Sequence, residues 1–206
     1  DRKPGFCGRI DFIHKTNLTE LFQVVCDRDA DWELAKSVWY PDRLEMGYED
    51  EDFSFSETKS ILFDDLAFSR QVWVNHSREP MTLRFRGEPE GTERDGCFFA
   101  SPVLSYGYQV GGVIGWSLPE KEYVLEPGQK VELVAACQVG NLCTQTRKEL
   151  EDQLAAFWKR YPGARDAEEA AKKQWEDFMA RVPEFSCSHP MLDRAWVYRW
   201  FIMRHC

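Results

Sequence analysis

The chain changes its hydrophobic period once along its length. Up to about residue 140, apolar side chains recur at every second position in short runs. In residues 81–86 this alternation gives one apolar and one hydrated face. In residues 66–74, Val72 and Val74 form the apolar face and alternate with Gln71, Trp73 and Asn75. The polar link at residues 75–80 favours a hairpin between these two strands.

Turn residues separate the other predicted strands. Asp64-Asp65 follows the apolar run 61–63, and Pro127-Gly128 forms a turn in which proline presets the first angle and glycine supplies the positive one. The other candidate strands are residues 97–100, 109–118, 122–125 and 130–136. Many short strands without intervening helices predict an antiparallel sandwich rather than a parallel sheet.

After residue 140 the apolar residues follow a helical period. Thr146 and Glu149 predict a capping box, in which the hydroxyl and the carboxylate each satisfy free amides at a helix start. One face of this helix is apolar at Leu150, Leu154, Phe157 and Trp158. A second helix is predicted from Asp166, where acidic residues repeat the capping device, and its apolar stripe stops at Pro183.

A third helix is predicted to begin near Pro190, because proline is tolerated in a first turn. Apolar side chains cover nearly its whole circumference between Met191 and Met203, which predicts a helix buried between layers. The preceding elements offer little cover for it, so we expect a larger helical domain to continue beyond Cys206. The chain starts at Asp1 without a signal-peptide core, and we expect both ends to be cuts.

The predicted fold class is therefore β then α. An antiparallel β-sandwich is expected in residues 1–140, and a helical segment in residues 141–206.

The charge and the lengths of the apolar runs indicate which classes of partner to expect. Among 206 residues, 26 are Lys or Arg and 35 are Asp or Glu, a net charge of −9, which argues against coating phosphate backbones. No apolar run approaches the roughly 20 residues of a membrane helix. Neither a nucleic acid nor a membrane is therefore an expected partner, and a cytoplasmic location is favoured over secretion.

The seven cysteines are odd in number and scattered, without a C-x-x-C pair, and the four histidines add no zinc-ligand spacing. We predict no metal and no cofactor. Cys26 and Cys137 lie in strand-like runs and fit reduced core thiols. Disulfides remain the alternative, because glycosylation triplets begin at Asn17 and Asn75.

The acidic and glycine-rich segments suggest no catalytic motif. Residues 27–31 offer the first carboxylates of a calcium loop, but Trp32 and Val38 occupy the positions that need glycine and glutamate. Residues 111–115 lack a phosphate-binding spacing and favour close strand packing or a bulge.

The secondary structure of residues 27–52 is only partly determined by their sequence pattern. Residues 32–40 fit either a helical turn or a strand, and residues 48–52 fit an acidic loop. Carboxylates that are adjacent in sequence, as at residues 49–52 and 64–65, do not by themselves flank a scissile bond, so loop solvation is favoured over catalysis.

Aromatic side chains can stack on sugar rings, although a single one is more often part of a core. In the third predicted helix, arginines lie among the aromatics, and a buried guanidinium such as that of Arg204 would need acidic or polar partners. We assign no catalytic residue. The candidate substrate-binding residues are Trp196, Tyr198, Arg199 and Trp200.

The order of the strand motifs resembles a known family. Residues 72–77, then 81–83, then 123–133 resemble the N-terminal β-sandwich of inverting glycoside hydrolases that carry an (α/α)6 barrel. Those sandwiches show an N-x-S/T turn between strands and a late L-x-P-G-x-x-x-x-L hairpin. The related groups include trehalases, glucosidases and mannosylglycerate-hydrolase-like enzymes.

The helical part extends the resemblance. Residues 175–178, 182–183 and 190–198 resemble the entry into the first barrel helix. The resemblance implies linker helices followed by the first helix of an (α/α)6-type domain. It also implies a non-catalytic N-terminal portion that packs against the barrel, while the general acid and base lie in the remainder of the helical catalytic domain. The implied partners are that domain and, through the complete enzyme, a carbohydrate such as a glucoside or a related oligosaccharide.

Two other functions remain open from the sequence. A carbohydrate-binding β-sandwich would use exposed aromatics such as Trp73 or Trp116. A structural protein would instead dock its third helix into another chain.

Overall fold

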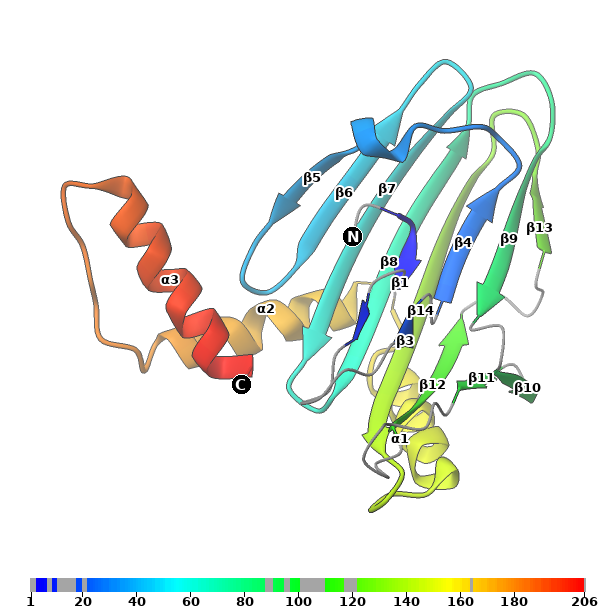
Figure 1. The fold of residues 1–206 in the computed structure, drawn as a ribbon. Helices are drawn as coiled ribbons and strands as arrows, with labels where there is room; N and C mark the ends of the chain where they lie inside the picture. Colours follow the sequence, from blue (N-terminus) through cyan, green and yellow to red (C-terminus); the bar gives the residue numbers. More distant parts are fainter. Residues whose placement is uncertain are drawn as a thin grey trace.

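Two antiparallel sheets pack face to face, and three helices follow them along the chain (Figure 1). The predicted order, a β-sandwich followed by helices, is confirmed. Which residues form two separate domains stays a prediction. The computed structural model describes residues 3–6, 9–10, 18–19, 22–87, 91–94, 97–100, 110–116, 122–163 and 165–205.

The large sheet has eight strands in the order β10-β11-β12-β14-β8-β7-β6-β5. Its strands are β5 (Lys36–Trp39), β6 (Leu44–Glu49), β7 (Phe53–Leu62), β8 (Leu66–Asn75), β10 (Thr92–Arg94), β11 (Cys97–Ala100), β12 (Val110–Trp116) and β14 (Lys130–Asn141). The small sheet has four strands in the order β1-β4-β9-β13. These are β1 (Gly5–Phe6), β4 (Phe22–Cys26), β9 (Met81–Gly87) and β13 (Glu122–Leu125), and β2 (Arg9–Ile10) pairs separately with β3 (Leu18–Thr19).

The strand pairing corrects the predicted hairpins. β8 pairs with β7 and β14, whereas β9 pairs with β4 and β13 in the other sheet. The turn at Pro127-Gly128 likewise leads from β13 in the small sheet to β14 in the large one. Both links therefore cross between sheets. The alternation of side chains fixes which face of a strand is apolar, but it does not name the neighbouring strand.

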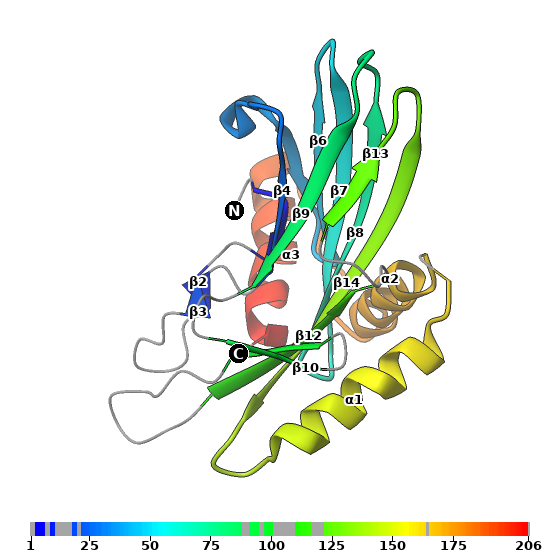
Figure 2. The same cartoon turned by 90° about the vertical axis from the view of Figure 1, so that its right-hand side faces the viewer.

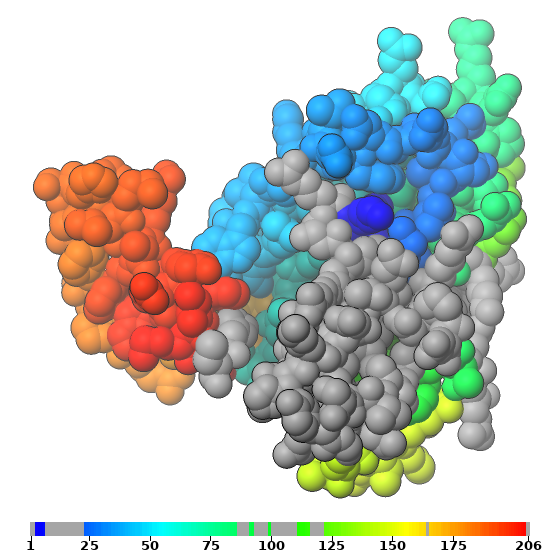
Figure 3. Space-filling model, in the orientation of Figure 1, coloured from blue at the N-terminus to red at the C-terminus, as the bar shows by residue number. Residues whose placement is uncertain are grey.

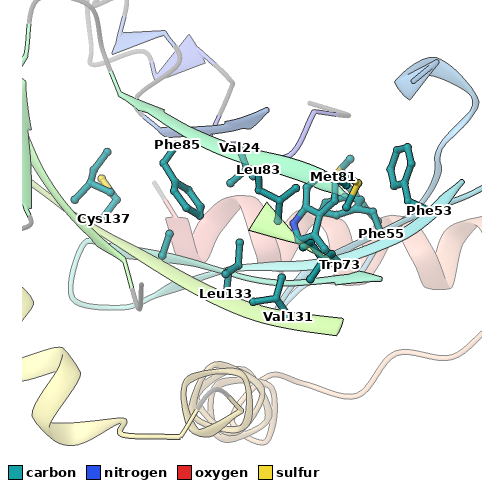
Figure 4. Packing of buried hydrophobic residues seen from close by; sticks show 14 residues of the cluster. Val24, Phe53, Phe55, Trp73, Met81, Leu83, Phe85, Val131, Leu133 and Cys137 are labelled. Atoms are coloured by element: carbon teal, nitrogen blue, oxygen red, sulfur yellow. The ribbon is translucent and has the colours of Figure 1, made fainter. Parts of the chain in front are cut away.

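The main core lies between the two sheets. Val131 and Leu133 from the large sheet face Leu83 and Phe85 from the small sheet, and Trp73 fills the space next to Met81 (Figure 4). We call this side of the large sheet its inner face.

For β9 the alternating pattern predicted the buried face correctly, at Met81, Leu83 and Phe85. For β8 it predicted the wrong face, because Gln71, Trp73 and Asn75 are buried and Val72 and Val74 are only half-buried.

A short helical turn closes one end of this core. The 3-10 helix η1 (Trp32–Leu34) is capped by Asp31, whose carboxylate accepts a hydrogen bond from the Glu33 N–H at 3.1 Å. The Trp32 ring contacts an aromatic cluster, with centroids 5.2 Å from Tyr48, 6.1 Å from Phe53, 5.5 Å from Phe55 and 6.0 Å from Trp73. The open question about residues 32–40 resolves as a helical turn followed by the strand β5.

Two residues suggested as surface sites are core residues. Trp73 is 0% exposed, so it cannot present a ring to a sugar, and that version of the carbohydrate-binding hypothesis is wrong. The side chain of Trp116 lies outside the described residues. Asn75 is also buried, and its amide donates to the carbonyls of Glu79 and Leu125, each at 2.8 Å. The triplet at Asn75 is therefore not open to glycosylation in the folded chain, and the one at Asn17 lies outside the described residues.

Three glycines on the other side of the large sheet, its outer face, let α1 (Arg147–Arg160) approach closely. A Cβ on Gly115 would lie 3.1 Å from Trp158 and 3.3 Å from Leu154, and one on Gly111 would lie 2.7 Å from Leu142. A Cβ on Gly140 would meet Leu150. The glycine-rich strand thus serves close packing, as predicted, and Figure 2 shows α1 lying along this face.

The predicted start and apolar stripe of α1 are confirmed. Thr146 and Glu149 form the capping box, and Leu150, Leu154 and Phe157 are buried against the sheet.

The second helix, α2 (Asp166–Met179), is tied to the same face by polar contacts. Arg70 donates to Glu168 at 2.7 Å, and the backbone N–H of Phe63 donates to the Gln174 amide oxygen at 3.2 Å. The predicted acidic cap is wrong. Asp166 is already helical, and its carboxylate accepts from the Gly163 N–H at 2.7 Å in the preceding turn.

Three of the cysteines whose side chains are described are free thiols. Cys137 is buried, as predicted, and desolvation raises the pKa of its thiol to about 12, which keeps it protonated. Cys26 is only half-buried. The third free thiol is Cys187.

We predict that Leu154→Ala lowers the free energy of unfolding by about 2–5 kcal/mol, because Leu154 is 1% exposed and its loss leaves a cavity under α1. Denaturant unfolding followed by circular dichroism measures the change. Gln153→Ala, at the exposed neighbouring position, is the control and should stay within about 0.5 kcal/mol of the parent chain. Equal effects of the two substitutions would contradict the packing of α1.

Candidate functional site

The last helix, α3 (Pro190–His205), stands out from the side of the sandwich. In the space-filling view it forms an orange-red lobe beside the body of the molecule (Figure 3). Cys187 leads into the helix, and its backbone N–H donates to the Asp193 carboxylate at 3.1 Å, which fixes the first turn. No described helix is both long and apolar enough to cross a membrane.

Aromatic rings attach α3 to the rest of the chain on two sides. Trp39, at the end of the edge strand β5, meets Tyr198 and Phe201 with ring centroids 6.0 and 5.0 Å apart. From α2, Trp175 lies 6.4 Å from Phe201. These edge-on contacts anchor the helix at the corner between β5 and α2.

The arginine near the end of α3 also stacks on aromatic rings. The Arg204 guanidinium lies 3.0 Å from the ring centroid of Phe63 and 5.5 Å from that of Phe178. Desolvation, together with the nearby charge of Arg181, lowers the pKa of Arg204. The expected acidic or polar partner is thus replaced by aromatic faces, which attract a cation through their negative quadrupole.

The four predicted substrate-binding residues do not gather at one place. Trp196 stacks on Phe185 at 5.2 Å and meets Trp200 at 5.7 Å, so these two tryptophans share one aromatic row. Tyr198 lies about 200° around the helix from Trp196, against Trp39. Arg199 is exposed. Their role in binding a substrate stays a prediction.

The expectation that α3 is buried between layers is wrong for this chain. None of its described side chains is buried, although most are apolar. Leu192 is 54% exposed and Met203 is 65% exposed. Arg199 is also exposed. It follows Leu192 by seven residues and precedes Met203 by four, so the three side chains lie on one face of the helix. We call these three residues the outer stripe of α3.

The sequence analysis missed Trp39. This residue is 46% exposed on an edge strand whose four side chains are all exposed, and it makes the main contact between β5 and α3. The only available signal was a large aromatic in a polar region of uncertain structure.

The acidic run at residues 49–52 organises a turn. Burial raises the pKa of Asp50, but hydrogen bonds from the Phe53 N–H, the Tyr48 hydroxyl and the Asp52 N–H outweigh it, so the net pKa lies below its usual range. The same bond to Asp50 raises the pKa of Tyr48 to about 12. Asp50 is thus a structural carboxylate, and β6 extends to Glu49 where a loop was predicted to have begun.

The arrangement defines a class of fold, namely a two-sheet antiparallel sandwich with helices on its outer face. No family model and no curated protein matches the sequence. Among solved structures, the chain is similar to a putative kojibiose phosphorylase from the human microbiome, with a TM-score of 0.54 and 10% sequence identity. The match covers 76% of this chain and 27% of that protein, so this chain spans about a quarter of its length. At this identity the likeness shows the fold alone.

We predict that Trp39→Ala loosens α3 without unfolding the sandwich. Loss of its two ring contacts should lower the local stability of α3 by about 1–3 kcal/mol, which is a rise of about five- to 150-fold in hydrogen exchange of the α3 amides. Val38→Ala, at the exposed neighbouring position on the opposite face of β5, is the matched control. Unchanged exchange in α3 after Trp39→Ala would show that β5 does not hold this helix.

Proposed function

We propose that this chain is a non-catalytic part of an enzyme that cleaves glycosidic bonds, and that it packs against a helical catalytic domain. The observation that carries the proposal is the exposed outer stripe of α3. The fold similarity to part of a putative kojibiose phosphorylase supports the enzyme class, because that protein is named for a reaction on a disaccharide.

The outer stripe fits a partner surface that is mainly apolar and carries a carboxylate. Leu192 and Met203, which are 54% and 65% exposed, would gain about 1–2 kcal/mol each from full burial. Arg199 between them would need an acidic partner once it is removed from water. The first helices of a packed helical domain provide this combination, since they bury apolar stripes against one another.

The proposal places the general acid and base in the helical domain. In a hydrolase, an acid protonates the leaving oxygen while a base activates water from the opposite side. In a phosphorylase, phosphate takes the place of that water. Both reactions break the same bond, and the supporting role proposed for this chain is identical in the two.

The predicted substrate-binding residues fit this arrangement to different degrees. Trp196 and Trp200 pack within the chain's own helical lobe, so their proposed role is to shape the lobe. Tyr198 is exposed and remains the proposed contact with substrate at the junction of the two parts, whereas the proposed role of Arg199 is to pair with a carboxylate of the partner.

A second candidate is a structural protein whose α3 docks onto an unrelated chain, because helix-in-groove recognition uses the same kind of apolar stripe. The two candidates differ in catalysis. Only the first expects glycoside cleavage in a polypeptide that carries this chain together with a helical domain.

The test uses the 206-residue chain and a polypeptide that joins it to a helical catalytic domain. We expect the chain alone to cleave no aryl glycoside or glucose disaccharide, with water or with phosphate, and the joined polypeptide to cleave one of them. Leu192→Glu with Met203→Glu should lower that activity more than about tenfold, because charging a central apolar contact costs about 2 kcal/mol or more.

The matched control adds the same two charges elsewhere. Gln153 and Ala156 are exposed on α1, and Gln153→Glu with Ala156→Glu should leave activity within about twofold. Cleavage by the chain alone would refute a non-catalytic role. Equal losses in the two double variants would refute docking through the outer stripe.

A further inference from the structure

The last strand of the large sheet, β5, has one side without a neighbouring strand. It ends the strand order of that sheet and pairs with β6 alone. All four of its side chains are exposed. Three large apolar residues in or beside it, Leu34, Val38 and Trp39, are 77%, 49% and 46% exposed. An apolar edge strand of this kind is a template for pairing with another strand.

The hydrogen bonds of the hairpin show which backbone groups face this free edge. Just beyond the end of β5, Tyr40 and Arg43 exchange both of their backbone hydrogen bonds, at 2.8 and 3.3 Å. Bonded and non-bonded positions alternate in an antiparallel pair, so every second residue from Tyr40 back along β5 bonds to β6. The N–H and C=O groups of Ser37 and Trp39 therefore point away from β6, and no strand in the described part of the chain pairs with them.

The helix α3 lies beside this edge and not in line with the sheet. Trp39 shares the inner face with Leu44, the residue opposite it on β6, and its ring meets Tyr198 and Phe201 of α3. Figure 2 shows α3 on the same side of the large sheet as the small sheet, and Figure 3 shows an open notch between the α3 lobe and the blue surface of β5 and β6. A further strand in the plane of the large sheet can therefore reach β5.

The same strand of a second copy fits this edge. When two copies of β5 run antiparallel with their Val38 residues opposite each other, Ser37 of each copy lies opposite Trp39 of the other. These are the two positions with outward backbone groups, so the pair can form four backbone hydrogen bonds. Each Trp39 ring then lies beside a small Ser37 side chain on the inner face, and the two Val38 side chains form an apolar pair on the outer face.

The neighbouring registers, shifted by two residues, form fewer bonds. A shift in one direction places Ser37 opposite Pro41, which has no N–H. A shift in the other direction places Trp39 opposite Ala35, which lies outside β5 and whose N–H already donates to the Trp32 carbonyl at 3.2 Å. The residues around β5 thus favour a single self-pairing.

The charges beside the edge are also complementary in this pairing. Lys36 is the only charged residue of β5, and no described residue forms an ion pair with it. Arg43 pairs with the carboxylates of both Asp42 and Glu45, at 2.8 and 2.6 Å, so this cluster carries one excess negative charge. In the paired copies Lys36 lies opposite Tyr40, whose ring centroid is 4.0 Å from the Arg43 guanidinium, and its long side chain brings the ammonium toward that excess charge.

We propose that this chain forms a symmetric dimer in which β5 of one copy pairs antiparallel with β5 of the other, so that the two large sheets become continuous. The contact involves only the four residues of β5 and their flanks, so it buries less than the roughly 1,200–2,000 Å² of a stable interface. We therefore expect a weak dimer, with a dissociation constant between about 10 µM and 1 mM. The outer stripe of α3 takes no part in it, so the dimer is independent of the docking proposed above.

The experiment is analytical ultracentrifugation of the 206-residue chain between about 5 µM and 1 mM, and we expect a shift from monomer to dimer over this range. Val38→Lys places two like charges opposite each other and should raise the dissociation constant more than about tenfold. Val124→Lys is the matched control, because Val124 is 48% exposed on β13, an edge strand of the other sheet. It should dimerise as the parent chain does.

Three further samples test the register and the face. A mixture of Val38→Lys with Val38→Glu should restore a dimer of one copy of each, because these positions are opposite only in the proposed pairing. Ser37→Pro removes an outward N–H without removing a bond to β6, and should also give a monomer. Leu192→Glu with Met203→Glu should keep the dimer, which separates this contact from the outer stripe of α3.

Hydrogen exchange follows the same contact at single residues. The amides of Ser37 and Trp39 should gain protection as the concentration rises, whereas the amide of Val38, which bonds to β6, should change little. A parent chain that stays monomeric at about 1 mM would leave the edge to a strand of another protein and would overturn the proposal. A dimer that survives Val38→Lys or Ser37→Pro, that is lost in Val124→Lys or in the α3 double variant, or that the mixture does not restore would overturn it as well.

Discussion

The outer face of the large sheet can be buried only by helices that come close to it, and small residues on both sides make this approach possible. On the sheet, Gly111, Gly115 and Gly140 leave room for side chains of α1 and of the segment before it. On α2, Ala167 and Ala171 are the buried residues. The ion pair between Arg70 and Glu168 then fixes α2 on the sheet. Because Trp175 of α2 contacts Phe201 of α3, the position of α3 depends on this packing as well. The surface that we assign to partner binding is thus determined by glycines and alanines at a distance from it.

The same arrangement explains why α3 is exposed. The small sheet covers part of the inner face, α1 and α2 cover the outer face, and α3 is left at the corner, where it contacts Trp39, Phe63, Phe185 and α2 (Figures 1 and 2). A helix that is apolar nearly all round normally lies between layers. Here it has one attached side and one hydrated side, and the unmatched apolar area is the physical basis for the proposed docking.

The sequence predicted where the strands and helices lie along the chain better than it predicted which strands pair with one another. Periodicity located the strands, and the capping box at Thr146 and Glu149 located the start of α1, because both signals are local. The hairpin predicted between β8 and β9 was wrong, since strand pairing is decided by packing across the whole sandwich. For the site, the sequence indicated the aromatics of α3 but could not show that Trp196 and Tyr198 lie on different sides or that Trp39 meets them. Those facts depend on contacts between residues far apart in the chain.

Inside the sandwich, a row of buried hydrogen-bonded side chains bears on the pairing of the strands; its members are Glu57, Ser69, Gln71 and Trp73. Because side chains alternate between the two faces, a strand that slides by two residues keeps the same face toward the core, so the alternation by itself does not exclude such a slip. Glu57 opposes Gln71 in the pairing of β7 with β8, and in this register the amide of Gln71 donates to Glu57 while it accepts from Trp73 on its own strand. A slipped pairing would leave a buried carboxylate without its donors, at a cost of several kcal/mol. Burial of the Glu57 carboxylate costs free energy, but its hydrogen bonds favour the observed pairing of β7 with β8. The strands β6 and β5 follow β7 in the sheet, so this pairing also fixes the position of Trp39 beside α3.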